Sequence, residues 1–203
     1  MIMQLSFWSR HNPTRYLFSE KILKTRGLRV DQELQYFERN WGGPVWDVGA
    51  SVGKYTTVLA RSNPLNTVFA FEPNLNSLYY LGYRSAKFHN VVIVPTALTL
   101  DGSHFETSYD PNFFAKPTGP RSSSLSLEEA IRKFGKPAFA KFDVEGGEYI
   151  LFDKDLEALK GCHLLIEWHK YKFQRPIPEM RYWKARDVVP DNGIQVTRYY
   201  EPI

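Results

Sequence analysis

The middle of the chain alternates between short apolar runs and longer segments with helical periodicity. The apolar runs are rich in β-branched and aromatic side chains, which suits the buried strands of a parallel sheet. We expect strands at 45–48, 67–71, 91–94, 139–142, 164–168 and 194–200. Helices are expected at 53–61 and 75–86, between the first three strands. This order predicts an α/β fold, with helices on both faces of a mostly parallel sheet.

The segments outside this alternation define the expected domain organisation. Residues 1–43 form an N-terminal helical or cap segment, and residues 44–203 form the main domain of one globular unit. A helix is expected at 31–40, with Asp31 as its N-cap. Asp101-Gly102 is typical of a hairpin turn, with a strand returning on its far side.

Composition narrows the class of protein. At 203 residues, with 43% hydrophobic and 15% aromatic residues, the chain can bury a single core. It contains no apolar run near the ~20 residues that span a bilayer, and its N-terminus lacks the order of a signal peptide. Cys162 stands alone, so we expect a buried thiol and a cytoplasmic location. The net charge of +4 is compatible with a polyanionic partner without requiring one.

The most informative stretch is V-W-D-V-G-A-S-V-G at 45–53. Gly49 and Gly53 stand where the backbone turns sharply after a strand and where a ligand can approach closely. The helix that follows places this turn at a helix N-terminus, as in the nucleotide sites of open α/β sheets. Glu72 ends the second strand roughly 20 residues later, where such folds present an acid to ribose hydroxyls.

The spacing of this turn discriminates between two ligands. An NAD site uses G-x-G-x-x-G and cradles a pyrophosphate with backbone N–H groups. Here the pattern is Asp47-x-Gly49-x-Ser51-x-Gly53, and Asp47 would repel a pyrophosphate but help to hold a cation. S-adenosylmethionine carries a sulfonium and an ammonium group and no phosphate. We therefore expect S-adenosylmethionine.

Further motifs continue the pattern through most of the chain. They are D-V-G-A-S-V-G-K-Y-T at 47–56, F-A-F-E-P-N at 69–74, P-T-A-L-T-L-D-G-S at 95–103, S-L-S-L-E-E-A-I at 124–131, K-F-D-V-E-G-G-E at 141–148 and L-L-I-E-W-H at 164–169. In this order they resemble the FkbM-type methyltransferases, a branch of the class I S-adenosylmethionine-dependent enzymes. The resemblance implies a three-layer, Rossmann-like fold with a mostly parallel seven-stranded sheet. Because the chain ends at Ile203, just after one strand, we expect the usual terminal antiparallel hairpin to be incomplete.

The resemblance also assigns a donor site at the carboxyl edge of the sheet. It implies that the first turn contacts the methionine moiety, that the end of the second strand holds the ribose, and that residues after the third strand line the adenine. The implied residues are Asp47, Gly49, Ala50, Ser51, Gly53, Glu72, Asn74, Thr96, Ala97 and Asp143. Of these, Asp143 is expected nearest the ammonium and methyl groups of the donor.

Methyl transfer to a hydroxyl requires alignment and a group that takes up the hydroxyl proton. Glu167 and His169 leave the fifth strand beside Asp143, and His169 is the best base candidate by its ordinary pKa. A structural role for His169, holding a backbone carbonyl, is the alternative. Asp143 and Glu167 could instead hold a divalent cation, magnesium or manganese. For Asp143 and Glu145 the alternative is an acid pair that offsets a helix dipole.

The expected reaction is therefore O-methylation of a hydroxyl on a glycan or small metabolite. Two other classes stay open. The first is 2′-O-methylation of an RNA ribose by a Lys-Asp-Lys-Glu set, which Asp143 fits and to which Lys24 or Lys170 could contribute. The second is a non-catalytic module that binds S-adenosylmethionine. The sequence carries no readable code for the acceptor or for the oligomeric state.

Overall fold

The computed structural model describes residues 28–99, 102, 124–153, 157–171 and 175–203. The chain divides into two compact units, Met1–Gln35 and Tyr36–Ile203. Helix α3 (Leu28–Phe37) provides the described residues of the first unit and the first two residues of the second. This helix begins before Asp31, so the expected N-cap lies inside the helix and its assignment was wrong.

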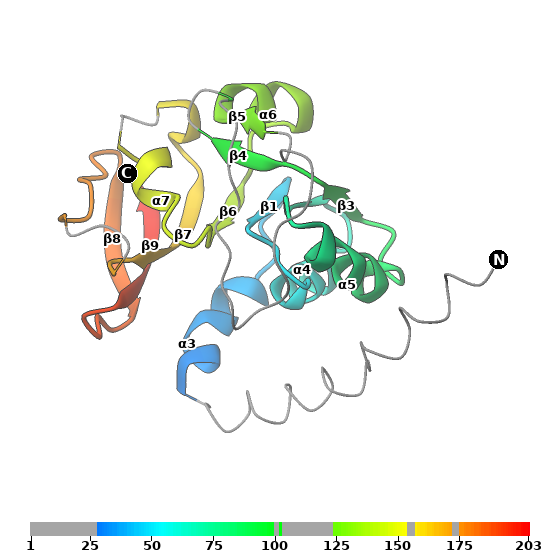
Figure 1. The fold of residues 1–203 in the computed structure, drawn as a ribbon, viewed down its shortest axis with the longest axis horizontal. Helices are drawn as coiled ribbons and strands as arrows, with labels where there is room; N and C mark the ends of the chain where they lie inside the picture. The colour runs from blue at the N-terminus through cyan, green and yellow to red at the C-terminus, as the bar shows by residue number, and fades with distance from the viewer. Residues whose placement is uncertain (1–27, 100–101, 103–123, 154–156, 172–174) are drawn as a thin grey trace. The chain divides into compact units, whose positions relative to one another are not determined.

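A seven-stranded sheet forms the centre of the second unit, in the order β3-β2-β1-β6-β7-β9-β8 (Figure 1). Its strands are β1 (Val45–Val48), β2 (Val68–Phe71), β3 (Val91–Val94), β6 (Phe139–Phe142), β7 (His163–His169), β8 (Trp183–Val189) and β9 (Gln195–Pro202). The first five run parallel, and β9 is antiparallel to both of its neighbours. The mostly parallel seven-stranded sheet is thus confirmed.

Helices and a small second sheet complete this unit. They are α4 (Lys54–Ser62), α5 (Leu75–Ser85), α6 (Leu127–Phe134), α7 (Glu148–Leu151), the short 3₁₀ helix η1 (Glu157–Leu159), and the parallel pair β4 (Ala97–Thr99) and β5 (Ser124–Ser126). Alternate strand residues serve two cores, because successive side chains point to opposite faces. Trp46 and Ile166 belong to the core that includes α6 and α7, whereas Val45 and Leu165 pack in the core that includes α4. The sheet is therefore the middle of three layers.

The terminal hairpin is complete, so the expectation of an incomplete one was wrong. Strands β8 and β9 pair antiparallel, with Trp183 opposite Pro202 and Lys184 opposite Glu201. The missed strand is β8, at the edge of the sheet, and its residues 184–187 are exposed. An exposed edge strand can carry polar residues on both faces, so it lacks the apolar pattern that marks the buried strands.

The region after β3 also differs from the expectation. Ala97–Thr99 pairs in parallel with Ser124–Ser126, and the strand expected to return from the Asp101-Gly102 turn lies outside the described residues. Ser126 then starts α6 through a capping box with Glu129, in which each side chain accepts from the other residue's backbone N–H. Helix α6 was not predicted, because its eight residues are too short for a clear helical period. In the described ranges, no helix has the length and apolar character needed to cross a membrane.

Candidate active site

The candidate site lies along the edge where the parallel strands end. The strand order reverses between β1 and β6, and open α/β sheets bind their ligands at such a point. Gly49 follows β1, Glu72 follows β2, and Asp143 follows β6. His169 is the last residue of β7. The topology therefore places the predicted donor and acceptor residues on one edge.

The turn after β1 needs glycine because of its own packing. Gly49 and Gly53 have φ angles of 79° and 82°, which L-residues with side chains rarely adopt. A Cβ atom on Gly49 would lie 1.8 Å from the backbone oxygen of Asp143, and one on Gly53 would lie 2.8 Å from Cδ1 of Leu81. The sharp turn is as expected. At Gly49, however, the close approach is between the β1 and β6 turns themselves.

Hydrogen bonds fasten this turn to the end of β2. The N–H groups of Gly49 and Ala50 both donate to the backbone oxygen of Phe71 at 3.0 Å. The Ser51 N–H donates to Oε2 of Glu72 at 2.8 Å, although Ser51 has a φ angle of 48°. The turn is held in one conformation from inside the protein, which is a form of preorganisation.

Glu72 is a buried carboxylate with a fixed orientation. Its Oε1 accepts from the Asn74 N–H at 2.8 Å, so both carboxylate oxygens are anchored by backbone donors. Burial raises the pKa of Glu72, and the two backbone hydrogen bonds oppose this shift. A carboxylate has about four lone-pair sites, so these two bonds leave capacity for two ribose hydroxyls.

The other donor residues expected near the ribose and adenine follow β2 and β3. The side chain of Asn74 caps α5 by accepting from the N–H groups of Asn76 at 2.9 Å and Ser77 at 3.2 Å. Thr96 and Ala97 are buried, directly before and at the start of β4. Asn74 thus has a structural role as the N-cap of α5.

A buried lysine, Lys141, connects the turn after β1 with Asp143 after β6. Nζ of Lys141 lies 3.3 Å from the backbone oxygen of Gly49, 3.4 Å from Oδ1 of Asp47 and 3.3 Å from Oδ2 of Asp143. Burial alone would lower the pKa of Lys141, but the charges of Asp143 and Asp47 outweigh it and raise this pKa. Asp47 also accepts from the Thr56 hydroxyl at 2.6 Å and is fully buried. Its charge is therefore engaged within the protein, and Asp143 is the more accessible acid of this group.

The sequence interpretation assigned no role to Lys141. A signal was present, because a lysine inside the apolar run F-A-K-F requires buried counter-charges. Its cross-strand neighbour in the sheet register is Asp47. Only the parallel pairing of β1 with β6 brings these two residues together, and sequence spacing does not reveal that pairing.

A second cluster surrounds His169, whose exposed fraction is 4%. Its Nδ1 hydrogen-bonds Oε1 of Glu148 at 3.1 Å. Its Nε2 faces three carboxylate oxygens, which are Oδ1 of Asp143 at 3.8 Å, Oε2 of Glu145 at 3.7 Å and Oε1 of Glu167 at 4.0 Å. The structure thus brings the expected catalytic residues together and adds two glutamates.

The charges around His169 change its protonation. Burial alone would lower the pKa of His169, but the hydrogen bond and charge of Glu148, together with Asp143 and Glu145, raise it to about 9. In the absence of a metal ion these carboxylates favour the protonated imidazole, unlike the histidine base of ordinary pKa that the sequence suggested. The alternative of a bond to a backbone carbonyl is also replaced, because the partner is the Glu148 carboxylate.

Glu148 holds His169 in place and is itself held by the backbone. It is fully buried, and its carboxylate accepts from the N–H groups of Val144 at 2.6 Å and Gly146 at 2.8 Å. The same carboxylate therefore shapes the turn before α7 and fixes the ring of His169. The sequence did not reveal this role, because it depends on the contact between α7 and the end of β7.

The remaining two acids have different environments. Glu145 has a φ angle of 54°, uncommon for a residue with a side chain, and its carboxylate accepts from the Tyr171 hydroxyl at 3.2 Å. Its side chain is 68% exposed, whereas that of Glu167 is 17% exposed. Glu167 accepts a hydrogen bond from the side chain of Gln195 on β9. Strand β9 of the terminal hairpin thus helps to hold the side chain of Glu167 in place.

Comparison with protein families identifies the chain. The family model of the methyltransferase FkbM domain matches residues 47–187, which is more than half of the sequence. The chain belongs to the FkbM methyltransferase family. A comparison with curated proteins gives no significant match.

Solved structures with low sequence identity share the fold of this FkbM methyltransferase. An rRNA methylase from Streptococcus thermophilus matches with a TM-score of 0.55 and 14% identity, covering 86% of this chain and 96% of that one. A methyltransferase from Streptococcus mutans, solved with S-adenosylhomocysteine, gives 0.55 and 12%, covering 86% and 98%. A fibrillarin/Nop5p complex gives 0.52 and 13%, covering 81% and 74%. Family and fold together identify an S-adenosylmethionine-dependent methyltransferase.

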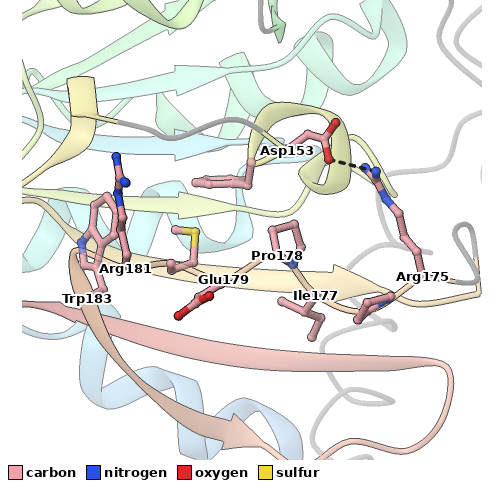
Figure 2. A pocket seen from close by; sticks show the side chains of 10 residues that line it. Asp153, Arg175, Ile177, Pro178, Glu179, Arg181 and Trp183 are labelled. Carbon is pink, nitrogen blue, oxygen red and sulfur yellow. Dashed lines mark hydrogen bonds and ion pairs between the residues drawn. The ribbon is translucent and has the colours of Figure 1, made fainter.

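The FkbM methyltransferase also has a cavity away from these residues (Figure 2). Its volume is about 560 Å³, and two of its lining residues, Arg175 and Asp153, form an ion pair of 2.9 Å. It is lined by Phe152, Asp153, Arg175, Pro176, Ile177, Pro178, Glu179, Met180, Arg181 and Trp183. None of the predicted donor or catalytic residues lines it. The residues expected to bind the donor lie instead at the ends of the parallel strands.

Proposed function

We propose that this FkbM methyltransferase transfers the methyl group of S-adenosylmethionine to a hydroxyl of a glycan or small metabolite. The main support for this proposal is that Asp143, Glu167 and His169 lie together on the same edge of the sheet as the turn after β1. A neutral hydroxyl is a poor nucleophile, and its activation requires a group that accepts or polarises the O–H bond. Carboxylates beside a fixed imidazole suit that task.

The donor is proposed to lie across the turn after β1. Glu72 accepts from the ribose hydroxyls with its remaining lone pairs, and Asn74 assists through its amide nitrogen. The turn itself fits the methionine moiety, and Thr96 and Ala97 line the adenine. Support comes from the anchored carboxylate of Glu72 and the rigid turn beside it.

Asp143 is proposed to serve both halves of the site. Its Oδ2 lies beside Lys141, whose ammonium also contacts the donor turn, and its Oδ1 faces His169. These contacts support a position for Asp143 between the proposed donor and the proposed acceptor. Alignment of the two reactants at such a point supplies much of the rate of a displacement reaction.

RNA ribose methylation is the second candidate. It is favoured by the rRNA methylase and the fibrillarin complex among the similar structures, and by the basic residues of the chain. Against it, Lys170 pairs with Asp191 at 2.5 Å instead of joining Asp143, and Lys24 lies outside the described residues. A glycan or metabolite therefore remains the first choice.

An acceptor screen with labelled S-adenosylmethionine tests this order. Incubation with pools of glycans, small metabolites and RNA should label a glycan or metabolite, and the product should carry an O-methyl group. Labelling of RNA alone, with a steep dependence on salt, would favour the second candidate. Donor binding in a calorimetric titration without turnover on any pool would instead indicate a non-catalytic binding module.

A further inference from the structure

The cluster around His169 has the composition of a metal site. Asp143, Glu145 and His169 each present one ligand atom, and these atoms all lie within 4.8 Å of one another. Two of the residues come from the turn after β6 and the third from the end of β7. The cluster therefore forms where the neighbouring parallel strands β6 and β7 end.

The orientation of His169 provides an independent observation. Its ring is buried, with an exposed fraction of 4%, and Glu148 fixes the Nδ1 side. Within the described residues, Nε2 makes no hydrogen bond, since the three facing carboxylate oxygens lie 3.7 to 4.0 Å away. A buried ring nitrogen aimed between carboxylates at such distances suits an atom placed among them.

Glu148 gives the cluster the second feature of a metal centre. A histidine that binds a metal almost always donates its other ring N–H to a carboxylate or carbonyl, which fixes the ring. Here the carboxylate is that of Glu148, which two backbone N–H groups hold in place. The support for the histidine thus exists in the folded chain.

The distribution of charge supports the same conclusion. Asp143, Glu145 and Glu167 present three carboxylates within 4.0 Å of one imidazole nitrogen. Lys141 neutralises the opposite oxygen of Asp143, so Oδ1 is left toward the cluster. A divalent cation would offset the mutual repulsion of these acids more fully than one imidazolium does.

We propose that Asp143, Glu145 and His169 bind a divalent transition-metal cation. One imidazole nitrogen with two carboxylate oxygens suits manganese or zinc, whereas magnesium prefers oxygen ligands alone. Ligands of such an ion at about 2.1 Å stand roughly 3.0 to 3.4 Å apart, so a small inward movement of the side chains completes the site. The proposal replaces the expected pair of Asp143 and Glu167 with three residues.

The role of the cation in catalysis rests on the proposed function. A hydroxyl bound to the ion loses its proton more readily, and Glu167 stands beside the cluster to accept that proton. The resulting alkoxide oxygen forms the new bond to the methyl carbon. The carbon–sulfur bond of the donor breaks, and its electron pair stays on the sulfur of S-adenosylhomocysteine.

Manganese binding to the metal-stripped full chain tests the site without any acceptor. Titration with MnCl₂, followed by the electron paramagnetic resonance of free Mn²⁺, should show one saturable site per chain that ZnCl₂ displaces. Glu145→Gln should weaken Mn²⁺ binding at least about tenfold. The matched control, Glu179→Gln, changes an exposed glutamate in the separate cavity and should bind as wild type does. Glu148→Gln should weaken binding by about 10- to 100-fold through the orientation of His169.

Absence of saturable Mn²⁺ binding, or equal affinity in wild type and Glu145→Gln, would overturn the proposal. Circular dichroism of each variant checks that loss of binding is not loss of folding. If S-adenosylmethionine binds and a hydroxyl is methylated without a metal, the metal site fails while the proposed function stands. If Mn²⁺ binds as expected but no hydroxyl is methylated, the proposed function fails while the site stands.

Discussion

The two halves of the candidate active site satisfy their polar groups in different ways. On the donor side, the carboxylate of Glu72 accepts from the N–H groups of Ser51 and Asn74. The N–H groups of Gly49 and Ala50 donate to the backbone oxygen of Phe71. On the acceptor side, three carboxylates face one nitrogen of His169 at 3.7 to 4.0 Å, beyond hydrogen-bond distance. The groups expected to bind the donor are therefore already hydrogen-bonded in the folded chain, whereas those expected at the acceptor leave between them the space that the proposed cation would occupy. Changes on the donor side should act mainly on folding and affinity, and changes on the acceptor side on chemistry.

The largest effect should come from Gly49→Val. Its Cβ would collide with the backbone oxygen of Asp143, and valine does not tolerate a φ angle of 79°. We expect little folded protein in circular dichroism and thermal unfolding. Gly82→Ala is the matched control, because an added Cβ in helix α5 meets nothing nearer than 4.0 Å, and it should unfold at the wild-type temperature or higher. A well-folded Gly49→Val protein that binds the donor would show that the two turns do not meet as described.

Removal of the buried ammonium group of Lys141 should have the next largest effect, on the free energy of unfolding. Lys141→Met leaves Asp47 buried without its charged partner, and loss of one member of a buried pair costs about 3–5 kcal/mol in the free energy of unfolding. Lys170→Met removes the surface pair with Asp191 and should cost at most about 1 kcal/mol. Urea denaturation of both variants checks this difference. Equal stabilities would contradict the role given to Lys141.

A smaller, more local effect is expected for Glu72→Gln. The side-chain NH₂ of the glutamine would face the backbone N–H of Ser51 or of Asn74, so that two donors would meet. The variant would also lack the negative charge that is proposed to accept hydrogen bonds from the ribose hydroxyls. Loss of hydrogen bonds to a charged group costs about 1.5–3 kcal/mol, so calorimetry should find S-adenosylmethionine bound about 10- to 100-fold more weakly. NAD should not bind to either protein. Equal donor affinity in both proteins would remove Glu72 from the site.

The smallest effect should appear in the dependence of donor binding on pH. Burial raises the pKa of Glu72 above its ordinary 4.5, so the folded protein keeps this proton at a higher pH than the unfolded chain does. Protonation therefore favours folding at low pH, and this contribution is lost as the pH rises through the folded-state pKa. Donor binding has the opposite sign, because it needs the ionised acceptor. Affinity should fall on acidification at a pH above 4.5 in wild type, and Glu72→Gln should lack this decrease.

The sequence was most informative where a strand has an apolar composition. Strands β1 and β6 are buried along their whole length and have the expected bounds. The edge strand β3 also has the expected bounds, because its four residues are all β-branched although Val92 is exposed. The donor turn and Glu72 were predictable for the same reason, since they follow directly from the ends of such strands. The edge strand β8 was missed because its exposed residues carry no apolar period.

The chemistry of the acceptor side depended on contacts between distant segments. Glu148 and His169 meet only because α7 packs beside β7. Against the effect of burial, this contact and the charges of Asp143 and Glu145 together raise the pKa of the histidine to about 9. A prediction based on the ordinary pKa of histidine could not include that shift. Lys141 similarly acquires its partners from the pairing of two strands far apart in the chain.

The most direct test of the whole account is the rate of methyl transfer by Asp143→Asn, measured with labelled donor and the acceptor found in the screen. Asp143 connects the two halves, since one of its oxygens faces Lys141 and the other faces His169. We predict that the rate falls at least about 100-fold, whereas the affinity for S-adenosylmethionine falls much less. Full methyl transfer by Asp143→Asn, or a loss of rate that only mirrors a loss of donor affinity, would contradict an acceptor side that activates the hydroxyl.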